Sequence, residues 1–222
     1  MRSAVGLLLV SIFTHPLSAD DMDVCDGIVL AGQCIEKDVQ HLDASYSKLT
    51  DLSALSELTE LRYLRVGFNP VADLSPLSSL TKLEYLNLDE MRVDDPLDLT
   101  PLSTLVKLKE LSVVLTPLED ISALSEMRSL ETFVAFGTDI EDVSPLAGLP
   151  SLTVLQLQTT AITSAEDLSR ISGLTHLYLN GTPIEDLSAL AALEHLEVLG
   201  PPSGPTLHGK AEIRAALEGL NR

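Results

Sequence analysis

A hydrophobic pattern recurs along the chain at nearly constant intervals. Its most regular member, which we call the anchor, returns every 22 residues, with one interval of 25. The anchors are Leu42, Leu64, Leu86, Leu111, Phe133, Leu155, Leu177 and Leu199. Apolar residues also stand three positions before and seven positions after nearly every anchor. A period of about 20–50 residues is typical of stacked repeats, so the chain is expected to be a solenoid with about eight strand turns.

Each repeat is expected to hold one short strand and one helical turn. The anchor and the apolar residue two positions later flank an outward position, which indicates a strand with one buried face. A short polar residue follows five positions after most anchors and can bond backbone groups where the chain turns. Further on, an Asp recurs with Ser or Thr two positions later, and Pro comes next at Pro76, Pro101 and Pro145. We interpret the Ser or Thr as a helix N-cap, so that each repeat returns through a short helix or 3-10 turn.

A known family has the same repeat. The 22-residue leucine-rich repeats of bacterial internalins resemble segments of this chain such as IEDVSPLAGLPSLTVLQLQTTA. The resemblance covers roughly residues 39–200 and implies an α/β fold: a right-handed leucine-rich-repeat solenoid with parallel strands on the concave face and short helical or 3-10 turns on the convex face. It also implies binding of a protein or ligand by the concave face. The wall-sorting segment and extra all-β domain of adhesion-type internalins have no counterpart, so a role in host-cell attachment is not expected.

Residues 1–19 are expected to be a secretory signal peptide. Arg2 is followed by a short apolar run, and small residues stand before Asp20, which favours cleavage after Ala19. The alternative is a buried N-terminal strand or helix. Export to the periplasm or the outside would place Cys25 and Cys34 in an oxidising compartment, where a disulfide is expected, with two free thiols or a metal site as the alternatives.

The ends of a solenoid need caps, because they would otherwise expose apolar surface. We expect residues 20–38 to be an N-terminal cap that holds the disulfide, residues 39–200 to be the repeats, and residues 201–222 to be a C-terminal cap. The last of these combines a Pro/Gly linker with an amphipathic helix from Lys210 to Leu220. A helix that docks a partner is the alternative for that segment.

The net charge of the chain excludes some classes of binding partner. The chain has 33 acidic and 14 basic side chains among 222 residues, a net charge of −19. Nucleic-acid binding needs Lys and Arg to neutralise phosphates, and docking on anionic lipid needs basic clusters, so neither is expected. A basic partner fits better. After the leader there is no run of 18 apolar residues, so no transmembrane segment is expected in the mature chain.

The sequence offers little catalytic chemistry. A Gly-rich phosphate loop, a His-Glu-x-x-His motif and a Ser-centred elbow are all missing. His41 and His176 share a repeat position but lie six strands apart, about 29 Å at about 4.8 Å per strand, so they cannot share one substrate atom. Acidic pairs such as Glu141-Asp142 could attract Ca²⁺, although a negative charge before a helical turn has a simpler role in capping. We therefore expect no enzymatic activity, no metal and no cofactor.

Function is expected to reside on the concave face, where outward strand positions gather two clusters. Tyr63, Arg65 and Tyr85 form one, and a mid-array apolar patch forms the other, with Leu115 at its edge. The binding candidates are Tyr63, Arg65, Tyr85, Val114, Val134, Phe136, Val154 and Tyr178. Exposed contiguous apolar surface often marks a binding site, and Tyr and Arg are enriched at interaction hot spots. The alternative is that aromatic and β-branched residues are present only because they suit strands.

The leading functional prediction is a secreted, non-enzymatic, monomeric protein-interaction module that binds an unknown and basic protein partner through its concave face. One alternative is binding of a glycan or cell-envelope polymer, with Tyr63 and Tyr85 as a stacking platform. The other is a structural component of the cell envelope.

Overall fold

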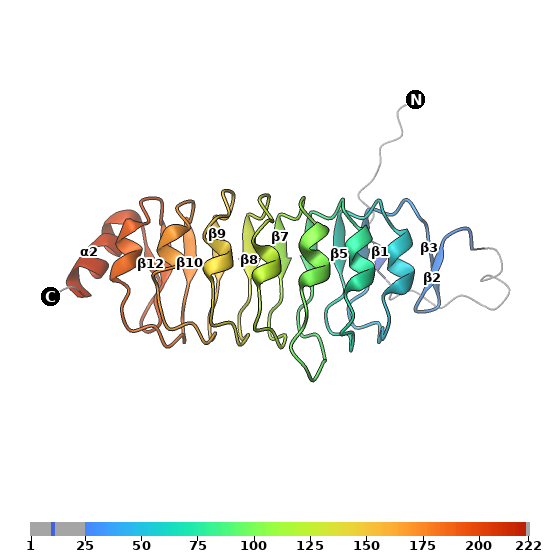
Figure 1. The fold of residues 1–222 in the computed structure, drawn as a ribbon, viewed down its shortest axis with the longest axis horizontal. Helices are drawn as coiled ribbons and strands as arrows, with labels where there is room; N and C mark the ends of the chain where they lie inside the picture. The colour runs from blue at the N-terminus through green and yellow to red at the C-terminus, as the bar shows by residue number, and fades with distance from the viewer. Residues whose placement is uncertain (1–9, 12–24, 221–222) are drawn as a thin grey trace, which may run out of the picture.

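A sheet of parallel strands, one from each repeat, runs the length of the molecule (Figure 1). The structure is a computed structural model that describes residues 10–11 and 25–220. Its repeat strands are β4 (His41–Asp43), β5 (Tyr63–Arg65), β6 (Tyr85–Asn87), β7 (Glu110–Ser112), β8 (Thr132–Val134), β9 (Val154–Gln156), β10 (His176–Tyr178) and β11 (Val198–Gly200). Anchor pairs with anchor throughout, and the 25-residue interval does not shift the register, because Leu86 still pairs with Leu111.

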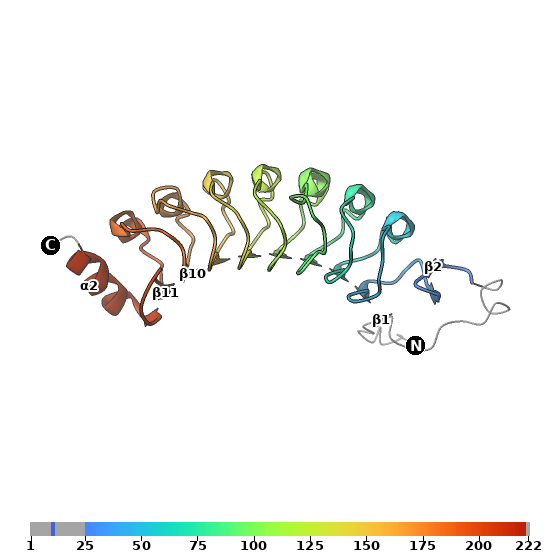
Figure 2. The same ribbon diagram turned by 90° about the horizontal axis from the view of Figure 1, so that it is seen from below.

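Short 3-10 helices carry the chain back on the opposite side of each repeat. They are η1 (Ser53–Glu57), η2 (Ser75–Ser79), η3 (Thr100–Thr104), η4 (Ser122–Leu124), η5 (Ser144–Leu146), η6 (Leu168–Arg170) and η7 (Ser188–Ala192). Figure 2 shows the strands on the inner side of an arc and the helical turns on its outer side. The expected solenoid, with a concave sheet and convex 3-10 turns, is confirmed.

The expectation that Ser or Thr is the helix N-cap is wrong. The 3-10 helix η2 already includes Ser75, and its N-cap is Leu74, which offers no side-chain acceptor. The acceptor comes from the recurring Asp instead: Asp73 Oδ1 accepts the backbone N–H of Ser75 at 2.8 Å. The same bond recurs at Asp51, Asp98, Asp120, Asp142 and Asp186. A carboxylate two residues upstream reaches the first helical N–H, so the Asp column has a structural role in local capping.

Hydrogen bonds from the Ser or Thr two positions later lower the pKa of most of these carboxyls. The groups with a lowered pKa are Asp51, Asp73, Asp98, Asp142 and Asp186. A pKa that is lower in the folded chain than in the unfolded chain adds stability above the unfolded value, and that stability is lost as the pH falls through the folded value. Because the unfolded value for Asp is about 3.9, the contribution is complete above about pH 5 and disappears on acidification.

We therefore expect thermal stability to fall steeply below about pH 4. The variant Asp73→Asn/Asp142→Asn keeps a capping oxygen but cannot titrate there, so its stability should fall less steeply with acid. A matched control, Glu119→Gln/Glu141→Gln, changes two exposed acids and should retain the steep fall. Thermal denaturation followed by circular dichroism from pH 7 to 2.5 measures all three, and equal slopes in the two variants would contradict the assignment.

A continuous leucine core fills the space between sheet and helices. The anchors are 0–1% exposed, and so is Leu55, the inward residue of η1. A column of buried polar residues runs beside them: Asn69, Thr116, Thr138, Thr160 and Thr182. Each bonds backbone carbonyls where the chain leaves the strand, as Thr138 Oγ1 does with Ala135 O at 2.9 Å. The expected bonding of these short polar residues to the backbone at the turn is therefore present.

A disulfide-linked hairpin lies at the N-terminal end of the solenoid. Strand β2 (Ile28–Leu30) pairs with β3 (Gln33–Ile35), and Cys25 and Cys34 form the expected disulfide. The buried residues Ile28, Leu30 and Ile35 belong to the solenoid core. The predicted signal peptide lies outside the described residues, except for β1 (Val10–Ser11), which pairs in parallel with β4. Removal of the signal peptide stays a prediction.

A strand and a helix lie at the C-terminal end of the solenoid. Strand β12 (Leu207–His208) pairs antiparallel with β11, and α2 (Lys210–Leu220) follows where an amphipathic helix was expected. Ile213 and Leu217 of α2 are buried against the solenoid, whereas the side chain of Leu220 lies outside the described part. No helix of the described residues is long and apolar enough to cross a membrane.

Candidate functional site

Three aromatic rings follow one another along the N-terminal part of the concave face. Register places His41, Tyr63 and Tyr85 side by side on β4, β5 and β6. The ring centroids of Tyr63 and Tyr85 are 4.1 Å apart with an interplanar angle of 7°, and those of His41 and Tyr63 are 5.9 Å apart. The two tyrosine faces therefore cover each other. A flat stacking platform made jointly by both rings, as glycan binding would use, is not what this geometry offers.

Arg65 lies next to these rings in a partly closed environment. Its guanidinium is 4.0 Å from the carboxylate of Asp43, and its Nε is buried without a hydrogen-bond partner among the described residues. Burial and the neighbouring Tyr63 raise the pKa of Tyr85 to about 12. The predicted trio of Tyr63, Arg65 and Tyr85 is thus brought together, with an acid beside it.

Asp89 is a concave residue that sequence reasoning did not single out. Its Oδ1 accepts the Ser112 hydroxyl at 2.6 Å and the backbone N–H of Val114 at 2.8 Å, and its other oxygen accepts the Asn87 amide. These bonds tie the end of β6 to β7 and keep a half-buried negative charge at the boundary between the aromatic cluster and the apolar patch. The alternation of Asn87 and Asp89 on outward positions was the available signal.

The mid-concave patch consists of Val114, Val134, Phe136 and Val154. These residues belong to three adjacent repeats, whose strands β7, β8 and β9 pair in register. Phe136 is 36% exposed and the valines are half-buried. The patch holds no charged side chain. Tyr178, the remaining candidate, lies on β10 and is separated from Val134 by Gln156 on the strand between them, so it belongs to neither cluster.

Residues four positions after the anchors form a second row at the ends of the strands, which we call the rim. The rim residues are Tyr46, Phe68, Glu90, Leu115, Gly137, Thr159 and Gly181. All have positive φ, from 48° at Glu90 to 76° at Gly181. The N–H of each donates to a carbonyl of the next repeat, at 2.7–3.2 Å. This ladder imposes the left-handed conformation on whichever residue stands there, at about 1–3 kcal/mol for a residue other than glycine.

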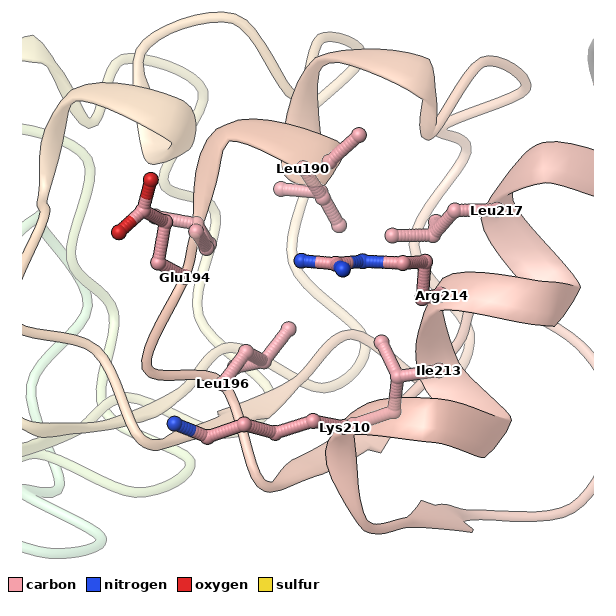
Figure 3. A pocket seen from close by; sticks show the side chains of 9 residues that line it. Leu190, Glu194, Leu196, Lys210, Ile213, Arg214 and Leu217 are labelled. Atoms are coloured by element: carbon pink, nitrogen blue, oxygen red, sulfur yellow. The ribbon is translucent and has the colours of Figure 1, made fainter.

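A small pocket lies between η7 and α2 (Figure 3). Leu190, Leu196, Ile213 and Leu217 form its apolar wall, and Arg214 reaches across its mouth. Its volume is about 30 Å³, enough for a water molecule and too small for an organic ligand. We interpret it as a packing gap beneath the C-terminal helix. Within residues 10–11 and 25–220, no group of three or more His, Cys, Asp or Glu side chains could hold a metal ion.

Solved structures with the same architecture include internalins of Listeria monocytogenes. The internalin InlF is 30% identical, with a TM-score of 0.58 over 72% of this chain and 52% of that one. Internalin C2 is 29% identical, with a TM-score of 0.64 over 74% of this chain and 68% of that one. Mouse RP105, solved in complex with MD-1, shares the fold at 24% identity and a TM-score of 0.64, covering 73% of this chain and 30% of that one. The chain thus spans about half the length of InlF.

Sequence comparison alone adds nothing to this likeness. No model of a protein family matches the sequence, and a search of curated proteins finds no match. The structural evidence rests on the 22-residue repeat, the in-register concave sheet and the convex 3-10 turns, together with the two internalins near 30% identity. On these grounds the chain is a bacterial internalin-like leucine-rich repeat protein.

Proposed function

We propose that this protein is an exported, non-enzymatic interaction module that binds a protein partner through its concave face. The observation that carries the proposal is the charge-free patch of Val114, Val134, Phe136 and Val154 in a chain with a net charge of −19. Apolar surface gathered on one face of an otherwise acidic protein is typical of an interaction site. A leucine-rich repeat neighbour, RP105, is itself solved in complex with a protein, MD-1.

Export is supported by two features of the N-terminal region. The first 19 residues have the layout of a signal peptide, and the Cys25–Cys34 disulfide suits an oxidising compartment such as the periplasm or the outside of the cell. The acidic surface favours a partner that is basic where it meets the concave face, and we expect the free protein to be a monomer.

The double variant Val134→Glu/Phe136→Glu tests the proposal. Two carboxylates in the centre of an apolar interface would have to be desolvated without partners, so we expect partner capture to drop at least about tenfold. The measurement is a cross-linking pull-down from envelope extract with residues 20–222, after circular dichroism has shown an unchanged fold.

A second variant separates protein binding from polymer binding. Tyr85→Ala alters the aromatic cluster and leaves the mid-concave patch intact, so protein capture should persist. Equal capture by wild type and Val134→Glu/Phe136→Glu would contradict the proposal. Binding to purified envelope polymer that is lost only in Tyr85→Ala would favour the glycan alternative instead.

A further inference from the structure

The rim carries large apolar side chains that contribute little to the core. Tyr46 is 53% exposed and Leu115 is 49% exposed, whereas Phe68 is half-buried and stacks on Tyr46 with ring centroids 3.9 Å apart. All three have the left-handed backbone conformation that favours glycine. Because these side chains are largely exposed, packing of the core does not explain why large residues stand at strained positions.

Two other repeats show that the fold accepts glycine at this position. Gly137 and Gly181 have the same positive φ and bond the next repeat in the same way. Gly137 also leaves room for Leu115, because a Cβ there would lie 2.5 Å from Leu115 Cδ2. Leu115 thus extends over the neighbouring repeat toward the mid-concave patch. The fold requires the left-handed conformation here but not a large side chain, so strain borne by an exposed apolar residue points to a role in recognition.

The order of side chains along the rim gives the chemistry of the partner. Glu90 stands between Phe68 and Leu115, and none of the ion pairs within the described part of the chain involves its carboxylate. Asp89, the preceding residue, faces the concave side, and its carboxylate already accepts hydrogen bonds from Ser112, Val114 and Asn87, so the charge that the rim offers is that of Glu90. Strands in a sheet are about 4.8 Å apart, so Phe68 and Leu115, two strands apart, are separated by about 10 Å with Glu90 between them.

We propose that the rim binds an extended segment of a partner protein in which a Lys or Arg lies between two apolar residues. The inference rests on the proposed function and names the kind of segment that such a partner presents. An extended chain rises about 3.3 Å per residue and alternate side chains share a face, so a segment of five residues presents its first, third and fifth side chains to Phe68, Glu90 and Leu115. Its apolar side chains contact Phe68 and Leu115, and its cation meets Glu90. The rim thereby extends the mid-concave patch toward the N-terminal end of the solenoid.

Glycine substitutions test this without disturbing the fold. Phe68→Gly and Leu115→Gly both relieve the left-handed strain, so Leu115→Gly, which removes an exposed side chain, should keep the unfolding midpoint of the wild type. Phe68→Gly also removes a half-buried ring stacked on Tyr46, so its midpoint should fall modestly while its circular dichroism spectrum stays that of the wild type. Thr159→Gly is the matched control, because it makes the same backbone change at a polar rim residue. Glu90→Lys reverses the charge between the two apolar positions.

The probe is a random 12-residue peptide library displayed on phage and selected on the wild-type protein, residues 20–222. We expect enriched peptides to hold a Lys or Arg between two apolar residues. Biosensor titration of the synthesised peptides should show at least tenfold weaker binding to Phe68→Gly/Leu115→Gly and to Glu90→Lys, and unchanged binding to Thr159→Gly.

Three results would overturn the inference: no enriched sequence, enriched sequences without a cation, or peptides that bind the double glycine variant as well as the wild type. If peptide binding were lost only in Val134→Glu/Phe136→Glu, the rim would be excluded as the binding surface, and the proposed function would still hold. If the pull-down captured no partner while peptides still bound at the rim, the proposed function would fail and the inference about the rim would hold.

Discussion

Replacing Asn69 with leucine is expected to lower the free energy of unfolding by about 3–5 kcal/mol. The Asn69 side chain is fully buried and bonds two successive repeats. Its Nδ2 donates to Ala44 O at 2.9 Å and to Val66 O at 2.7 Å, and its Oδ1 accepts the N–H of Leu49 at 3.0 Å. Leucine has a similar shape but leaves these three backbone groups without partners, and each costs about 1–3 kcal/mol when buried.

A threonine of the same column supplies the control. Thr160 Oγ1 makes one backbone bond, to Leu157 O at 2.8 Å, so Thr160→Val should cost only about 1 kcal/mol. Urea denaturation of both variants measures the difference. Equal losses would mean that the extra bonds of Asn69 contribute nothing beyond those of threonine. Threonine in place of asparagine in the four later repeats of this column would then carry no cost.

The solenoid could be predicted from the sequence because one periodic constraint governs every repeat. Each leucine has to face the same core as its counterpart in the next repeat, and a shift of one residue would expose it. Leu42 and Leu64 pair accordingly. The N-cap prediction failed where two residues competed for one role: Ser75 and Asp73 both have suitable oxygens, and the carboxylate of Asp73 makes the bond.

The candidate site could be predicted only as far as position in the repeat determines which face a side chain occupies. That reasoning correctly placed Tyr63 beside Tyr85, yet ring orientation depends on contacts between neighbours, which the pattern does not contain. The left-handed conformation of Leu115 was likewise hidden, because it comes from a bond to Phe136 O in the following repeat. Glycine at the same position in two later repeats was the indirect signal.

Phe133→Ala is expected to destabilise the protein by about 3–5 kcal/mol, the usual cost of a large cavity in a core. Phe133 is the anchor of β8, is 0% exposed, and stands where the other repeats have leucine. Two residues later on the same inward face, Ala135 replaces the Val or Leu of most repeats. We interpret the pair as a large residue compensated by a small one, which keeps the packing density of this repeat close to that of its neighbours.

A double-mutant cycle tests that compensation. Ala135→Val alone adds volume beside an intact Phe133 and should cost about 1–3 kcal/mol, and Phe133→Leu alone should leave a small void and cost about 1 kcal/mol. Together they recreate the Leu111 and Val113 pair of the preceding repeat, so the double variant should be close to wild type. Free energies from urea denaturation complete the cycle. Additive losses would show that the two side chains do not share space, and the substitution of Phe for Leu at this anchor would then need a different cause.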